Sequence, residues 1–150
     1  LGEDTGLSLP DGHEVRYVLQ VGSGNEVQVR DWTGTRAPMH ATPSGLVFLA
    51  EWPQEAVSAY VGHGLVTLTS RTISESTALT RRLAEVRAAG YAWGHEEYAE
   101  GITSVAAPVR DAAGRAIAAV HAHGPTYRFP GGRAEHVTGS VRDTARRIAA

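Results

Sequence analysis

Two histidines stand one residue apart in the segment AAVHAHGP, which covers residues 118–125. On a β-strand, side chains at positions i and i+2 point to the same face, so His121 and His123 would act together. Four interpretations are open: metal ligands, catalytic acid and base groups, the lining of a binding pocket, or residues on a solvent-facing strand surface. The choice depends on the elements that position the two rings.

The composition limits the chemistry that these histidines could share with other residues. The chain has 150 residues and no cysteine. This length suits one domain with a sizeable core, and the lack of cysteine excludes disulfides, thiolate zinc sites and cysteine nucleophiles. The net charge is -2 and the basic residues are scattered. This chain by itself therefore lacks the basic stripe that is typical of nucleic-acid binding.

The ends of the chain and its apolar runs bear on location. The apolar runs are too short to span a bilayer, and residues 1–4 (LGED) are unlike the start of a signal peptide. We expect a cytoplasmic protein with no membrane contact. Because the first residue is Leu and not Met, we expect a fragment or a processed product.

Several segments have the composition of strands. Residues 15–21 and 27–32 flank turn-forming residues and predict a hairpin, and residues 91–93 predict a short strand. A second hairpin is predicted from residues 102–110 and 115–123. Because strands and helices do not alternate regularly, the pattern predicts an α+β fold with an antiparallel sheet.

Helix signals separate these strands. Thr42 and Pro43 have the residue types of an N-cap and a first helical position, and they precede an apolar run that ends at Ala50. Gly90 predicts a left-handed stop, and Thr72 with Glu75 could form a capping box. The further predicted helices cover residues 53–61, 74–89 and 135–148, the last with Val137, Val141, Ala145 and Ile148 on one side.

The second hairpin places the histidines. A four-residue turn at 111–114 pairs Ser104 with His121 and Ile102 with His123. The two rings then share a face with one hydroxyl and small apolar side chains, a mixture that suits a pocket for a small polar molecule. The solvent-facing interpretation stays open. A metal site would need a third ligand, from His40, from His95 or from the acidic loop 96–100.

Two segments resemble a known family. RAPMHATPSGLVFLA (36–50) is similar to the stretch with a HAT-x-x-G core that opens the effector domain of IclR-family transcriptional regulators. GYAWGHEEYAEGITSVAAPVRDAAGRAIAAVHAHGP (90–125) resembles the long C-terminal signature of that family: GY, an EE pair, an AAPV strand, a D-x-x-G turn and a final GP. A looser similarity extends over nearly the whole chain.

The resemblance implies a GAF-like fold, with a mostly antiparallel central sheet flanked by helices, that binds a small metabolite without being an enzyme. It also implies no cofactor, self-association as a dimer or tetramer, and an upstream winged helix-turn-helix domain, absent from this chain, that alone contacts operator DNA. By position, the ligand contacts implied are Met39, His40, Ala41, Thr42, Pro43, Ser44, Gly94, Ile102, Ser104, His121 and His123.

This chain departs from the family pattern at four of those places. Relatives often have serine at both positions of the last-strand pair, an acidic residue where Gly94 stands, and a small residue where Pro43 stands. We therefore expect an effector of its own.

The expected effector is a small organic acid, aromatic acids included. The first turn after Thr42 would offer the N–H groups of Ser44, Gly45 and Leu46 to a carboxylate. The other end of the acid would lie against Ile102, Met39 and Trp93.

Other polar and aromatic residues have plainer interpretations. Glu96, Glu97 and Glu100 could serve as ligands or as pocket acids, but an acidic loop more often faces solvent, which is what we expect here. We expect Trp32 and Trp52 to be core or interface anchors. Two alternative functions remain at this stage. One is a metal-dependent or histidine-based hydrolase, and the other is a purely structural oligomerisation domain.

Overall fold

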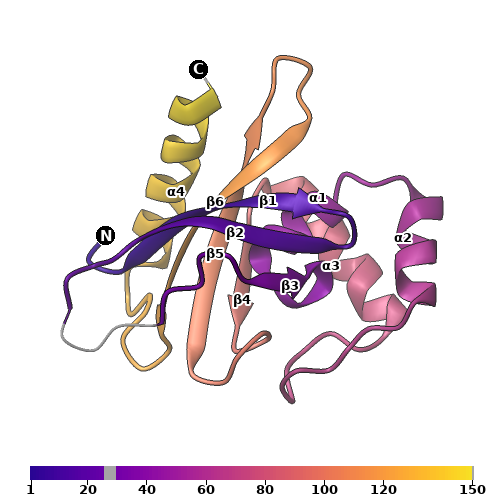
Figure 1. Ribbon diagram of the computed structural model, residues 1–150, viewed down its shortest axis with the longest axis horizontal. Helices are drawn as coiled ribbons and strands as arrows, with labels where there is room; N and C mark the ends of the chain where they lie inside the picture. The colour runs from indigo at the N-terminus through magenta and orange to yellow at the C-terminus, as the bar shows by residue number, and fades with distance from the viewer. Residues whose placement is uncertain (26–29, 150) are drawn as a thin grey trace.

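The computed structural model describes residues 1–25 and 30–149 and shows one mixed domain built on an antiparallel sheet (Figure 1). The sheet has six strands in the order β3-β2-β1-β6-β5-β4. The α+β prediction with an antiparallel sheet is confirmed. The strands are β1 (Asp4–Asp11), β2 (Glu14–Val21), β3 (Arg36–Pro38), β4 (Ala92–His95), β5 (Ile102–Arg110) and β6 (Ala116–Pro125).

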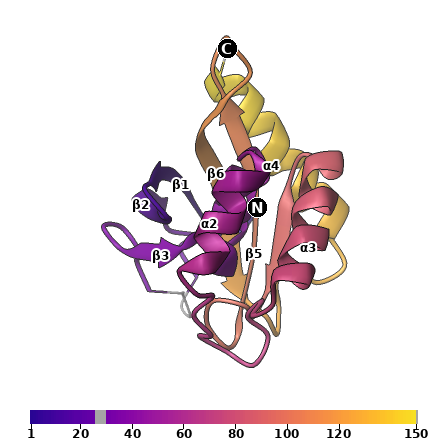
Figure 2. The ribbon, with the colours of Figure 1, turned by 90° about the vertical axis from the view of Figure 1, so that its right-hand side faces the viewer.

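Helices cover both faces of the sheet and create two cores. One core packs α1 (Pro43–Leu49) and α3 (Ser76–Ala89) against β5 and β6. The other packs α4 (Ala134–Ala149) against the opposite face of the same two strands. The helix α2 (Gln54–Gly62) lies beyond α1 and α3 at the right edge of Figure 1, and it faces the viewer in Figure 2. No helix within the described ranges has the length and apolar character needed to cross a membrane.

The local signals at the helix ends are mostly confirmed. Thr42 is the N-cap of α1, and its hydroxyl accepts the N–H of Gly45 at 3.0 Å. Gly90 ends α3 with a φ of 80°. The proposed capping box is wrong, because the Thr72 hydroxyl instead accepts N–H groups of the preceding turn and donates to the Glu97 carbonyl at 2.6 Å.

The last turn of α4 also departs from its pattern. Val137, Val141 and Ala145 are buried as expected, but Ile148 is 52% exposed. It faces a shallow apolar groove beside Leu19, because α4 covers β5 and β6 and leaves the outer face of β1 and β2 open.

The first predicted hairpin is not observed among the described residues. β2 pairs with β1 on one side and with β3 on the other. Of the expected second strand, residues 27–29 lie outside the described residues and 30–32 are not a strand. β1 escaped prediction because Gly6 and Pro10 disfavour strands. Gly6 is required there, since a Cβ atom at this position would lie 2.7 Å from the His121 ring and 2.3 Å from the Leu19 carbonyl.

The second hairpin forms, with its register moved by two residues. Ser104 pairs with His123, and Ala106 pairs with His121. Arg110 pairs with Ala116, which lengthens the loop by one residue, and an irregularity between Val109 and Arg110 moves the register by one more. A shift of two keeps every side chain on its predicted face, because strand alternation has a period of two.

Candidate functional site

A cavity opens between the start of α1 and the half of the sheet formed by β2, β5 and β6. The space open to the centre of a water molecule is about 40 Å³. Among the residues implied by the family resemblance, all except Met39 and His40 line it. The lining residues are Tyr17, Trp32, Ala41, Thr42, Pro43, Ser44, Gly94, Glu97, Tyr98, Ile102, Ser104, His121 and His123.

The two histidines of β6 face this cavity and are buried. His121 is 3% exposed and His123 is 4% exposed, so the solvent-facing interpretation is wrong. Their rings are nearly parallel with centroids 5.4 Å apart, and the Tyr17 ring meets His121 edge-on at 5.1 Å. Both nitrogens of His121 and Nε2 of His123 have no hydrogen-bond partner among residues 1–25 and 30–149.

Burial sets the charge of this pair. Burial, with a smaller contribution from the neighbouring His123, lowers the pKa of His121 to about 3. Burial also lowers the pKa of His123, while the negative charges of Asp4 and Glu3 act in the opposite direction. Both imidazoles are therefore neutral near pH 7, and each can donate one hydrogen bond and accept another.

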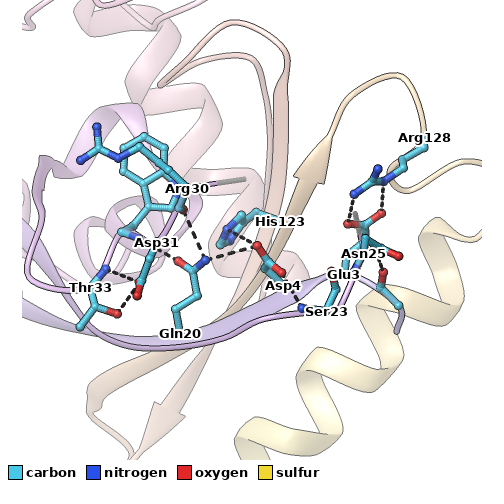
Figure 3. Close-up of polar contacts among 12 residues, drawn as sticks. Glu3, Asp4, Gln20, Ser23, Asn25, Arg30, Asp31, Thr33, His123 and Arg128 are labelled. Carbon is cyan, nitrogen blue, oxygen red and sulfur yellow. Dashed lines mark hydrogen bonds and ion pairs between the residues drawn. The ribbon is translucent and has the colours of Figure 1, made fainter. Parts of the chain in front are cut away.

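A buried carboxylate on β1 lies behind His123. Asp4 is 2% exposed, and its Oδ2 lies 3.9 Å from His123 Nε2. The same carboxylate accepts the Ser23 N–H at 2.7 Å and the Gln20 side-chain amide at 3.3 Å (Figure 3). Because Gln20 in turn accepts the Trp32 N–H at 2.9 Å, this network fixes the segment that carries Trp32 to the cavity.

The start of α1 forms the opposite wall, and it offers fewer donors than the sequence suggests. The Gly45 N–H is bonded to the Thr42 hydroxyl, and the Leu46 N–H to the Thr42 carbonyl at 2.9 Å. Thr42 thus serves as an ordinary N-cap. The hydrogen bonds of the described residues leave the Ser44 N–H and hydroxyl free. The expected three-donor cradle is therefore wrong, and Ser44 is its remaining member.

Glu97 enters the cavity wall although the acidic loop was expected to face solvent. It is 7% exposed and forms an ion pair with Arg82 at 2.6 Å. Its other oxygen accepts the His95 N–H at 3.1 Å. Glu96 and Glu100 keep more exposed positions. The Glu97 charge is thus compensated inside the protein before any ligand binds.

Three aromatic residues at the site were missed by the sequence reasoning. Tyr17 comes from β2, Tyr98 from the acidic loop, and Trp32 from the segment before β3. Trp32 and Tyr98 meet edge-on with centroids 5.4 Å apart, and the Arg30 guanidinium lies 4.6 Å over the Trp32 ring. If β1 had been recognised as the strand between β2 and β6, Tyr17 on β2 could have been placed near the histidines. No pattern near Trp32 indicates the long-range contact.

Three expected contacts lie elsewhere. Met39 is fully buried in the core under α1. His40 uses both ring nitrogens, one with the Tyr60 hydroxyl and one with the Val66 carbonyl, each at 2.8 Å. Trp93 belongs to the core under α4, where its indole N–H donates to Thr138 at 3.0 Å. Within the described part of the chain, no group of three or more His, Asp or Glu residues could hold a metal ion.

The fold and the cavity define a class of protein: an α+β domain that encloses a small polar-lined space between its sheet and a helix start. Residues 1–150 match the family described as the bacterial transcriptional regulator IclR C-terminal domain, and the chain belongs to this family. It is an effector-binding domain of the IclR type, from a family of regulators and not of enzymes. The resemblance found in the sequence is confirmed.

Individual relatives agree with this assignment. The chain is 33% identical over 148 residues to the HTH-type transcriptional repressor AllR of Klebsiella pneumoniae, covering 98% of this chain and 54% of the repressor. The C-terminal domain of the Escherichia coli regulator KdgR superposes with a TM-score of 0.85 at 30% identity, covering 99% and 86% of the two chains. The chain spans about half the length of the curated relatives it matches.

One solved relative contains a small acid. It is a double mutant of the PobR inducer-binding domain from Acinetobacter in complex with 3-hydroxybenzoic acid. Its TM-score is 0.91 at 29% identity, and the match covers 99% of this chain and 88% of that one.

Proposed function

We propose that this domain binds a small organic acid in the cavity beside His121 and His123, and that the bound acid regulates a DNA-binding domain of the same protein. The observation that carries this proposal is the set of buried imidazole nitrogens in the cavity wall that find no hydrogen-bond partner within the described part of the chain. A buried polar group left unpaired costs about 1–3 kcal/mol, so a ligand with matching polar atoms would recover that free energy.

The remaining wall suits the rest of such a molecule. Tyr17, Trp32 and Ile102 provide apolar surface, and the hydroxyls of Ser44 and Ser104 supply directional hydrogen bonds. The acid found in the PobR relative supports the same ligand class. The small volume of the cavity, about 40 Å³ for the centre of a water molecule, favours a compact acid over a bulky one.

The regulatory half of the proposal rests on the relatives. AllR is described as an HTH-type repressor, and about half of its length lies outside the match. We expect the upstream winged helix-turn-helix domain of this protein to contact operator DNA, in a dimer or tetramer. An acid that binds one arrangement of the subunits more tightly than another would shift the equilibrium between the two arrangements. The shift would change how the DNA-binding domains contact the operator.

Calorimetry on this chain tests the binding step. Lactate, pyruvate, benzoate and 3-hydroxybenzoate are titrated into the wild type, into His121→Asn and into the control His136→Asn, which alters an exposed histidine on α4. We expect at least one acid to bind, with an affinity about tenfold weaker for His121→Asn and unchanged for the control. Equal affinities in all three proteins would refute the cavity as the acid site.

A further inference from the structure

We propose that the cavity takes up its acid as an anion together with one proton from solvent, and that His123, with Asp4 behind it, holds this proton. The inference rests on the proposed function and specifies how the same site distinguishes an acid from a neutral molecule of the same shape. It also assigns a role to Asp4, which does not line the cavity: Asp4 positions His123 and stabilises the protonated form of that ring.

The first step is the charge of the cavity wall. Among the described residues that line it, none is an arginine or lysine, and the single carboxylate, Glu97, is already paired with Arg82. The Arg30 guanidinium lies 4.6 Å over the Trp32 ring and is not among the lining residues. An anion moved from water into such a space without a countercharge pays a large desolvation penalty. A protonated imidazole would supply the missing positive charge.

The second step identifies the imidazole. His121 is enclosed by Gly6 of β1, by the Tyr17 ring of β2 and by His123, none of which carries a negative charge. His123 instead faces Asp4, with Nε2 3.9 Å from Oδ2. A positive charge on His123 is therefore stabilised by a buried carboxylate, and a positive charge on His121 is not.

The third step concerns the other charged groups around His123. Glu3, also on β1, acts on it with the same sign as Asp4, but it already binds Arg128 through contacts of 2.6 Å and 3.1 Å. From β6 the neighbour is the neutral His121. Tyr17 of β2 contacts His121 and lines the cavity, to which the acidic loop contributes Glu97 and Tyr98.

Asp4 is held by Ser23 and Gln20, so its charge stays in place behind the ring (Figure 3). In the free protein the cost of burial keeps His123 neutral in spite of this carboxylate. A bound anion on the cavity side adds a second negative charge beside the His123 ring, and the two charges together favour the protonated ring. On binding, neutral His123 takes up one proton from solvent and pairs with the bound anion. No covalent bond to the ligand forms. Between the pKa of His123 in the free protein and its higher pKa in the complex, the apparent Kd should therefore rise about tenfold for each pH unit.

Calorimetry in two buffers measures the proton directly. Lactate and 3-hydroxybenzoate are titrated at pH 7 in phosphate and in Tris, whose ionisation enthalpies differ, and each is compared with its uncharged amide, lactamide or 3-hydroxybenzamide. We expect about one proton taken up per acid bound, none with the amides, and a Kd for the acid that weakens about 100-fold from pH 6 to pH 8. This measurement requires only the wild-type chain.

The unfavourable outcomes are distinguishable. An acid that binds with no proton uptake and a constant Kd refutes the proton step and leaves the proposed function standing. An amide that binds as tightly as its acid across this pH range has the same consequence. If neither acid binds at any pH, the proposed function falls, and this inference falls with it.

A matched pair of variants tests Asp4. Asp4→Asn keeps a hydrogen-bond acceptor for Ser23 but removes the charge, whereas Asp11→Asn makes the same change at the opposite end of β1, where Asp11 contacts Arg36 at 2.9 Å. We expect Asp4→Asn to weaken acid binding about tenfold at pH 7 and to leave amide binding unchanged, and Asp11→Asn to change neither. Equal loss of acid and amide binding in Asp4→Asn would show a purely structural role and overturn the assignment.

Discussion

The ring of Pro43 occupies the space into which a side chain at position 94 would project. A Cβ atom added to Gly94 would lie 3.0 Å from Pro43 Cγ and 3.1 Å from Pro43 Cδ. The family resemblance leads us to expect a different residue at each of these two positions, and the structure places the two residues in contact with each other. The same added Cβ would lie 3.8 Å from Oε2 of Glu97, so a carboxylate still reaches this part of the cavity wall from a neighbouring position.

Replacement of Gly94 by alanine should therefore destabilise the domain by about 1–2 kcal/mol, since an extra methyl group in a packed site forces its neighbours apart. The double variant Gly94→Ala with Pro43→Ala should lose less than the sum of the two single changes. Urea unfolding of the four proteins measures this coupling. Gly62→Ala in α2 is the control, because a Cβ atom there meets nothing within 4 Å. Strict additivity would contradict the steric relationship.

Gly6 on β1 should tolerate substitution far less than Gly94 does. A Cβ atom at this position would lie 2.3 Å from the Leu19 carbonyl, which belongs to the backbone of β2 and cannot move independently. We expect Gly6→Ala to lower the free energy of unfolding by about 3 kcal/mol or more and to displace the His121 ring. Gly139→Ala on α4, where a Cβ atom meets nothing within 4 Å, should be neutral or stabilising. A Gly6→Ala variant as stable as the wild type would exclude this close packing.

These two glycines also show where sequence reasoning succeeds and where it stops. Local signals were sufficient for the start of α1 at Thr42, the end of α3 at Gly90 and the β5–β6 hairpin, because each depends on residues adjacent in the chain. They failed for β1, since Gly6 contradicts strand propensity and is explained only by Leu19 and His121, which lie on other strands. Tertiary packing there overrides local preference.

The candidate site divides in the same way. His121 and His123 were assigned to one face correctly even though the pairing register moved by two residues, because that face depends only on alternation. His40, Met39 and Trp93 were misplaced, and Trp32 was not assigned to the site. Their positions depend on contacts such as the bond between His40 and Tyr60, which link segments with no shared local pattern.

The ion pair between Arg82 and Glu97 predicts an asymmetric mutational response. Arg82→Ala leaves the Glu97 carboxylate, which is 7% exposed, without its cation, and we expect a loss of about 2 kcal/mol. Glu97→Gln removes the charge and can still accept the His95 N–H, so it should cost less. In the double variant Arg82→Ala with Glu97→Gln, part of the loss should be recovered. Thermal and urea unfolding measure all three, and an Arg82→Ala loss below that of Glu97→Gln would contradict a buried, uncompensated charge.

The stability of the domain should fall in acid because of His121. Its pKa is about 3 in the folded chain against 6.5 when unfolded, so below pH 6.5 the unfolded state binds the proton more tightly and is favoured. Between pH 7 and pH 5 this difference removes about 2 kcal/mol, and the loss continues until the pH approaches the folded value. Urea midpoints measured from pH 8 to pH 5 should therefore decline more steeply for the wild type than for His121→Asn. The exposed His136→Asn should follow the wild type, whereas parallel declines in all three proteins would mean that His121 is not held neutral by burial.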